Sequence, residues 1–408
     1  MSSSSHSGKA HFRDFLKSQS PYLENVEQQD AVAHCDAAVQ RLSNIGMLLA
    51  SMKRNIGQPF RGITTDGSVR PNLFERADDD IHVDAIAFCG ENILQALTED
   101  QKPKVFFPLE AEERRLWQNT HLYFDISRFG IRLDETSDEV QSRVLKLLDS
   151  AMSPEGYQKA MLATKTNAFL GRLYKAPGVL NDFSYNFAMF GQPSTTDPWG
   201  WMLFGHHLCL NFFVYGNHIE ITPTFSGAEP NEIDEGPLLG TKLYTPEQNL
   251  GLRFMQQLPS DLQVQALVNQ DINSPEKGSM TWAVAAAFQD NRIIPYQGTR
   301  LASAVSPATR ELLLEIVEQF VLYLPQQARR RKRAEVAKHF DDTYFAWVGD
   351  FDGDNAKFYY RIHSPVILCE FEHCPSIFLG NTKAERFHIH THVRAPNGGD
   401  YGMALLDT

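Results

Sequence analysis

The chain of 408 residues carries 38 Lys and Arg against 50 Asp and Glu, a formal net charge of −12. This acidic balance argues against a general affinity for nucleic acid or anionic lipid, because both attract a positive surface field. Hydrophobic residues make up 42% and charged residues 22%, which is usual for folded proteins and disfavours the collagen-like, disordered and disulfide-scaffold classes. We therefore expect a soluble globular protein without nucleic-acid or membrane partners.

The N-terminal sequence MSSSSHSGKAHFRDFL has no apolar stretch typical of a secretory signal, and no later segment approaches 18 consecutive apolar residues. The five cysteines are widely spaced and form no C-x-x-C pair, which favours reduced thiols. Among them, Cys369 and Cys374 are expected to be buried hydrophobes rather than metal ligands. These features predict a cytoplasmic protein, and none of them indicates its oligomeric state.

Helical patterns dominate the first part of the chain. Apolar residues recur at three- and four-residue steps from 26 to 52, as in an amphipathic helix. A second helix is predicted over 83–97. Over 137–173 we predict two helices separated near Ser153 and Pro154, because proline cannot continue an inner helical turn.

From Asp182 onward, long aromatic and β-branched runs are typical of strands. Strands are predicted over 183–190 and 199–225, with a hairpin turn at Tyr215-Gly216-Asn217. The later elements expected are helices over 246–269 and 307–340 and about four strands over 343–403.

The chain has no internal repeat and no low-complexity linker. We therefore predict one interleaved α+β unit over 1–408. It comprises a flexible N-terminus (1–20), a mainly helical part (21–180) and a mainly antiparallel, strand-rich part with inserted helices (181–408). The dense basic run 329–333 is interpreted as a solvated helix face rather than a nuclear-localisation or nucleic-acid-binding segment.

The strongest chemical signal is the segment Arg386-Phe387-His388-Ile389-His390-Thr391-His392-Val393-Arg394. In a strand, His388, His390, His392 and Arg394 share one face, while the residues between them take the other. Imidazoles about 6.6 Å apart along a strand can converge on one ion with bonds of about 2.0–2.1 Å. The alternative is a set of separately hydrogen-bonded imidazoles, but three on one face favour a metal site.

A second pair of histidines, His206 and His207, lies within the strand predicted to begin at 199. Because adjacent residues on a strand point in opposite directions, only one of the two normally enters a given site. His207 falls on the more polar face and is the better candidate ligand. His206 either packs in the apolar layer with a hydrogen-bond partner or enters the site through a bulge.

Glu229 follows a predicted strand and precedes Pro230, which constrains the loop. Its carboxylate could serve as a metal ligand or general base, or it could be an ordinary turn residue. His218, at the tip of the predicted hairpin, is expected to face solvent. Arg361, Arg394 and Arg61 are candidates for binding an anionic or carbonyl-bearing substrate, although an arginine of this kind is more often a structural ion-pair partner.

The sequence resembles domain of unknown function family 3500, found in bacteria and fungi, over most of its length. The residues that carry the resemblance are Pro59 to Gly67, Arg115 with Trp117 and Asn119, Trp199-Gly200-Trp201 with Gly205-His206-His207, Thr222 to Phe225 with Gly227 to Pro230, Tyr359 to Ile362, Glu370-Phe371, His388 to Thr391, and Asp400-Tyr401-Gly402.

The resemblance implies that the shared motifs include His206, His207, Glu229, His388 and His390. It does not support His218 or His392. After His-x-His-Thr, family members tend to carry Trp-Arg-Asp, whereas this chain has His392-Val393-Arg394-Ala395. That difference beside the predicted site implies a different substrate, and the fungal relatives suggest one from secondary metabolism.

Together, His207, His388, His390 and Glu229 are the predicted metal ligands, and zinc is the favoured ion. Zinc with three protein ligands and an open position would activate water for a hydrolase or lyase acting on a small organic molecule. Iron or copper in a redox enzyme is the alternative, since the same residue types suit these ions. A metal-stabilised binding protein without turnover is the third reading. The candidate catalytic residues are Glu229, His206, Arg361 and Arg394.

Overall fold

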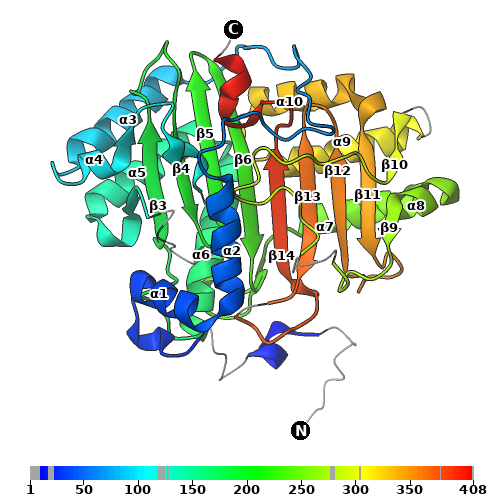
Figure 1. Cartoon of the computed structure of the whole chain (residues 1–408), viewed down its shortest axis with the longest axis horizontal. Helices are drawn as coiled ribbons and strands as arrows, with labels where there is room; N and C mark the ends of the chain where they lie inside the picture. Colours follow the sequence, from blue (N-terminus) through cyan, green and yellow to red (C-terminus); the bar gives the residue numbers. More distant parts are fainter. Residues whose placement is uncertain are drawn as a thin grey trace.

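The computed structural model describes residues 10–16, 23–117, 125, 128–275, 281–302, 305–376 and 378–406. One large sheet runs through this part of the chain in the order β1-β3-β4-β5-β6-β14-β13-β12-β11-β10, with β2 beside β3 and β9 beside β11. Figure 1 shows the sheet spanning the width of the molecule, with α3, α4 and α5 at its β3 end and α8 at its β9 and β11 end.

The strands of this sheet are β1 (Phe106–Phe107), β2 (Ile131–Arg132), β3 (Tyr185–Phe190), β4 (Trp199–Gly205), β5 (Leu208–Tyr215), β6 (His218–Ala228), β9 (Leu267–Asn269), β10 (Thr299–Arg300), β11 (Tyr344–Gly349), β12 (Phe358–His363), β13 (Leu368–Cys374) and β14 (Glu385–Arg394). Neighbouring strands are antiparallel except in the pairs β1 with β3 and β9 with β11. A separate ribbon pairs β7 (Glu232–Ile233) with β8 (Thr241–Lys242). The predicted α+β class and mainly antiparallel sheet are confirmed.

The α-helices are α1 (Ala31–Arg41), α2 (Ser43–Asn55), α3 (Val83–Ala96), α4 (Lys102–Val105), α5 (Asp138–Ala151), α6 (Pro154–Leu173), α7 (Thr245–Gln257), α8 (Ser260–Ala266), α9 (Pro307–Phe320) and α10 (Gln326–Lys338). The predicted break before α6 is present: Ser153 caps the helix by accepting from the Gly156 N–H, and Pro154 takes the first turn. The single helix predicted over 26–52 was wrong, because Leu42 has an extended backbone and separates α1 from α2.

Alternation along the strands gives the sheet two chemically different faces. On one face, Tyr360 and Phe345 pack against helices α9 and α7, with ring centroids 6.1 Å from Phe320 and 4.7 Å from Phe254. The other face of β12, β13 and β14 carries charged and imidazole side chains, because the paired residues Arg361, Glu370 and His392 alternate with these apolar ones. The candidate site lies on this polar face.

Within the predicted flexible N-terminus, the structure describes residues 10–16, and the remainder of 1–20 lies outside the described residues. Phe12–Phe15 form a 3-10 helix, with Phe12 buried against Phe169. Phe15 also contacts Phe387 at the start of β14, with ring centroids 5.2 Å apart. This segment therefore packs against the start of β14, the strand that carries His388.

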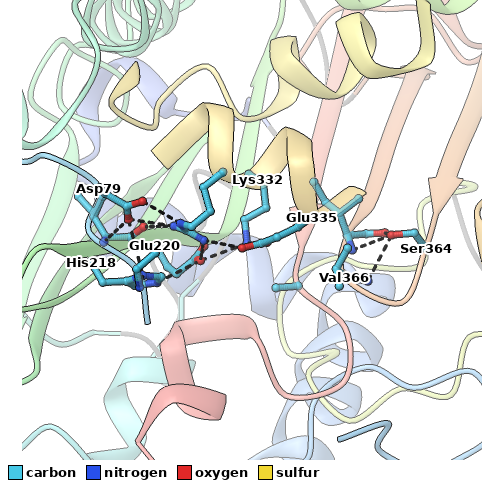
Figure 2. A network of polar contacts seen from close by, with 12 residues as sticks. Asp79, His218, Glu220, Lys332, Glu335, Ser364 and Val366 are labelled. Carbon is cyan, nitrogen blue, oxygen red and sulfur yellow. Dashed lines mark hydrogen bonds and ion pairs between the residues drawn. The ribbon is translucent and has the colours of Figure 1, made fainter. Parts of the chain in front are cut away.

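The expectation that the basic run 329–333 forms a solvated face was wrong for Arg331 and Lys332. Arg331 donates to Asp79 and Glu220, both at 2.8 Å, and Lys332 lies 3.1 Å from Glu220 and 2.9 Å from Glu335. Figure 2 shows this network joining α10 to β6. Burial of these charges is tolerated because each has oppositely charged partners at hydrogen-bond distance.

His218 belongs to the same network, so the expectation that it faces solvent was also wrong. It is 1% exposed, and its Nε2 lies 3.3 Å from Glu220 Oε1. The Ala77 N–H donates to its Nδ1 at 3.1 Å. The turn at Tyr215-Gly216-Asn217 is present as predicted, but residues 77–79 cover the hairpin end there. No helix in the described ranges is long and apolar enough to cross a membrane.

Candidate metal centre

Three imidazoles meet at the centre of the sheet. His388 and His390 lie on β14, and His207 lies in the connection between β4 and β5. Their Nε2 atoms are 3.0 Å apart for His388 and His390, 3.2 Å for His207 and His390, and 3.3 Å for His207 and His388. We call these residues the histidine triad.

The triad has the dimensions of a metal site. Bonds of about 2.0–2.1 Å in tetrahedral geometry place ligand nitrogens about 3.3 Å apart, close to the separations found. Burial, followed by the neighbouring His390, lowers the pKa of His388 well below its usual range, so this imidazole is neutral, as a metal ligand must be. Lone pairs of neutral imidazoles that converge on one point repel one another, and a cation at that point removes the repulsion.

His207 reaches the triad from a turn, not from a strand. We predicted that His206 and His207 continue the strand, but Gly205 on β4 pairs with Leu208 on β5, and the two histidines form the turn between them. His207 has a φ of +59°, in the left-handed region that non-glycine residues seldom adopt. Strained backbone of this kind is concentrated at functional sites.

Gly227 on β6 leaves room for two of the imidazoles. Its N–H donates to the His207 carbonyl at 2.9 Å, which ties the turn to β6. A Cβ atom at Gly227 would lie 3.1 Å from the Cδ2 atoms of both His207 and His390, and 2.6 Å from the Ile389 carbonyl oxygen. The glycine therefore allows β6 and β14 to approach beneath the triad.

Glu229 follows β6 and lies beside the triad. Its Oε2 is 3.7 Å from His388 Nε2, while its Oε1 accepts from the Leu379 N–H at 2.9 Å and from the Ser376 hydroxyl. Burial is the largest effect on this carboxyl group and raises its pKa, although the two donors act in the opposite direction. The position suits either a fourth ligand or a base that takes a proton from a metal-bound molecule.

His206 lies next to the triad with a defined tautomer. The Asn167 amide nitrogen donates to the Asn181 carbonyl and the Ser184 hydroxyl, both at 3.0 Å, so the amide oxygen must accept from His206 Nδ1 at 2.8 Å. The His206 ring stacks on that of His207 with centroids 3.8 Å apart. Ligating atoms of His206, His207 and Glu229 lie within 4.8 Å of one another.

Glu372 was not identified from the sequence. It lies opposite His390 on β13, and its Oε1 is 3.5 Å from His390 Nδ1. The N–H groups of Trp282 and Ala283 donate to its other oxygen at 3.1 and 3.3 Å. A carboxylate behind a ligating histidine orients the ring. Alternation in Glu370-Phe371-Glu372 puts the two carboxylates on one face, a signal that could have pointed to this residue.

Cys374 lies close to Glu372 and His390, with ligating atoms within 4.8 Å. Burial, followed by the charge of Glu372, raises the pKa of its thiol well above the usual range. Cys369 is also buried, and burial raises the pKa of its thiol in the same way. In the absence of a metal, both are therefore protonated thiols, as is usual for buried cysteines.

The structure places the other candidate residues away from the triad nitrogens. Arg394 is fully buried in salt bridges with Asp290 and Asp400. Arg361 is 4% exposed and donates to Gln297 at 2.8 Å.

Two further candidates are Arg61 and His392. Arg61 is exposed, and its Nη2 donates to the Asn291 carbonyl at 3.0 Å. The His392 ring packs against Phe225, with centroids 4.9 Å apart. His392 shares the face of His390 but is not part of the triad. Asn119, in one of the motifs, lies outside the described residues.

The chain matches the model of a protein family. The model of the family described as "protein of unknown function (DUF3500)" matches residues 79–403, most of the chain. The matched range contains the whole triad, Glu229 and Glu372, but not the motif from Pro59 to Gly67. Neither the curated proteins nor the solved structures include a protein that matches this chain.

Proposed function

This chain belongs to the DUF3500 family of proteins of unknown function, and we propose that it is a metal-dependent enzyme of hydrolase or lyase type acting on a small organic molecule. The observation that carries the proposal is the convergence of the three Nε2 atoms within 3.0–3.3 Å of one another. Glu229, with an oxygen 3.7 Å from His388 Nε2, adds a carboxylate at the same place.

In this proposal His207, His388 and His390 hold a divalent ion, with zinc the favoured choice. Zinc held by three protein ligands keeps one position open and lowers the pKa of bound water to about 7. Glu229 would serve as the base beside that ion. The Leu379 N–H and the Ser376 hydroxyl donate to its Oε1 and leave its Oε2 facing the triad. Access is expected on the side of His390, whose side chain is 17% exposed against 6% for His388.

A non-haem iron or copper oxidoreductase is the second candidate. The observation in its favour is Glu229, because a carboxylate within reach of three imidazoles makes a ligand set that iron also accepts. The identity of the metal separates this candidate from the first. A metal-stabilised binding protein is the third candidate. In that case the metal is present, and substitution of the metal-ligating residues alters no measured turnover.

The test is metal analysis of protein purified without an affinity tag, combined with His388→Ala and His390→Ala. Stoichiometric zinc supports the first candidate, and iron or copper supports the second. Each variant should lose the metal while its circular dichroism spectrum remains that of the parent. His82→Ala, which changes an exposed histidine far from the triad in the sequence, should keep the metal. Normal metal content in both triad variants would contradict the proposal.

A further inference from the structure

A second row of polar side chains lies next to the triad on the same face of the sheet. Arg361 on β12 pairs with Glu370 on β13, and Glu370 pairs with His392 on β14. Directly paired residues of antiparallel strands share a face. His363 lies two residues after Arg361 and so adds to this face, while His390 lies two residues before His392.

Several buried polar atoms in this row have no hydrogen-bond partner among the described residues. They are Nε of Arg361 and both ring nitrogens of His363 and of His392. The three residues are 4%, 1% and 2% exposed. Native proteins leave few buried polar atoms unsatisfied, because each one loses its hydrogen bonds to water without replacing them. A group of them on one face indicates a place where a bound molecule supplies the missing partners.

The charge of Arg361 indicates what that molecule carries. Arg361 donates to the neutral amide of Gln297, and it forms no ion pair within 4.0 Å in the part of the chain that the structure describes. Glu370 lies opposite, and the Arg361 charge opposes the burial that raises the pKa of its carboxyl group. The Glu370 oxygens accept hydrogen bonds from the Tyr359 hydroxyl at 2.7 Å and from the backbone N–H groups of 284–285, and none from the Arg361 guanidinium among the described residues. A buried cation with an open donor attracts an oxyanion.

We infer that Arg361, together with His363 and His392, binds the carboxylate group of the molecule on which the metal centre acts. A carboxylate matches the planar donors of Arg361, and its two oxygens can accept from the Arg361 Nε and from the imidazoles that lack partners. A phosphate dianion suits the row less well, because Glu370 and Glu372 lie on the same face. This inference rests on the proposed function, because only that function makes the bound molecule a substrate. The anion site itself does not require the metal.

The spacing fits a small substrate. Arg361 and His390 are two strands and two residues apart, which corresponds to about 12 Å between their Cα atoms at about 4.8 Å per strand and 3.4 Å per residue. A molecule with a carboxylate at one end could therefore place its reacting group at the triad.

The test uses acetate as the probe and ligand-observed NMR as the readout, on the protein as purified. Four proteins are compared: the parent, Arg361→Gln, the double variant His388→Ala/His390→Ala, and Arg253→Gln. Arg253 on α7 is an exposed arginine paired with Glu315, and serves as the matched control. We expect acetate affinity to fall at least about tenfold in Arg361→Gln, the loss of a charge-assisted hydrogen bond. The double variant and the control should bind like the parent.

Equal acetate binding by the parent and Arg361→Gln would overturn the inference. So would loss of binding in the double variant alone, which would place acetate on the metal, and so would tighter binding of inorganic phosphate than of acetate. Should Arg361→Gln fail to fold, Arg361→Lys replaces it, with weaker acetate binding expected because the planar fork is gone. Metal content is measured separately, so the metal proposal can fail while the acetate result stands.

Discussion

Glu372 lies directly opposite His390 on the neighbouring strand, with its Oε1 3.5 Å from His390 Nδ1. The other oxygen is held by the N–H groups of Trp282 and Ala283. Glu372 thus links His390 of the triad to the segment that contains Trp282 and Ala283. A carboxylate in this position raises the basicity of the ligand and fixes its ring.

Glu372→Gln should weaken metal binding by about 10–100-fold, the usual cost of losing the carboxylate behind a ligating histidine. The backbone donors to Glu372 can still bond the amide oxygen, so the fold should be retained. Competition with a chromophoric chelator measures the affinity. The control is Glu385→Gln, at the start of β14 and paired with Lys357. An unchanged affinity in Glu372→Gln would show that this carboxylate does not support the site.

Gly227→Ala should disturb the triad directly. The added Cβ would meet the His207 and His390 rings at 3.1 Å and the Ile389 carbonyl oxygen at 2.6 Å, a contact that backbone cannot easily relieve. We expect loss of bound metal and a lower melting temperature. Gly46→Ala in α2, where a Cβ meets nothing within 4 Å, should keep the bound metal and should not lower the melting temperature. A Gly227→Ala protein with normal metal content would contradict the close approach of these strands.

Lys332→Met should destabilise the fold through the buried network of Figure 2. Lys332 is 2% exposed and lies between Glu220 and Glu335. Removing one partner from a buried ion pair costs about 3–5 kcal/mol, because it leaves charge uncompensated. Urea unfolding measures the change. Arg330→Met, at the neighbouring exposed position, should stay within about 0.5 kcal/mol of the parent. Equal stability of the two variants would show that the network is energetically neutral.

His34 on α1 should make the fold sensitive to acid. Burial, followed by the Arg41 cation, lowers its pKa to about 4. The unfolded chain takes up this proton near pH 6.5 and the folded chain does so only near pH 4, so stability should fall as the pH drops through this window. In His34→Gln, urea unfolding at pH 7.5 and pH 5 should show a smaller loss than in the parent. An equal loss in both proteins would assign the acid sensitivity to other groups.

Sequence periodicity was sufficient for the strand that carries His388 and His390, because alternation alone places both on one face. It misplaced the backbone of His207, since the turn between β4 and β5 depends on a residue in the left-handed region and on the hydrogen bond that the Gly227 N–H of β6 donates to the His207 carbonyl. Glu372 was missed because its partner is set by the register between β13 and β14.

The buried charges of α10 were missed for a related reason. Arg331 and Lys332 have the pattern of a solvated run, and their burial depends on carboxylates at 79 and 220, far away in the chain. Local pattern therefore predicted the elements and the residue types of the site. The partners across strands and between distant segments came only with the tertiary structure.

The most direct test of the metal centre is a crystal of the untagged protein with diffraction collected at the zinc, iron and copper absorption edges. The proposed metal centre predicts one strong anomalous peak about 2.0–2.1 Å from the Nε2 atoms of His207, His388 and His390. Absence of a peak at the triad, or a peak bound by other residues, in protein that analyses for stoichiometric metal would contradict it.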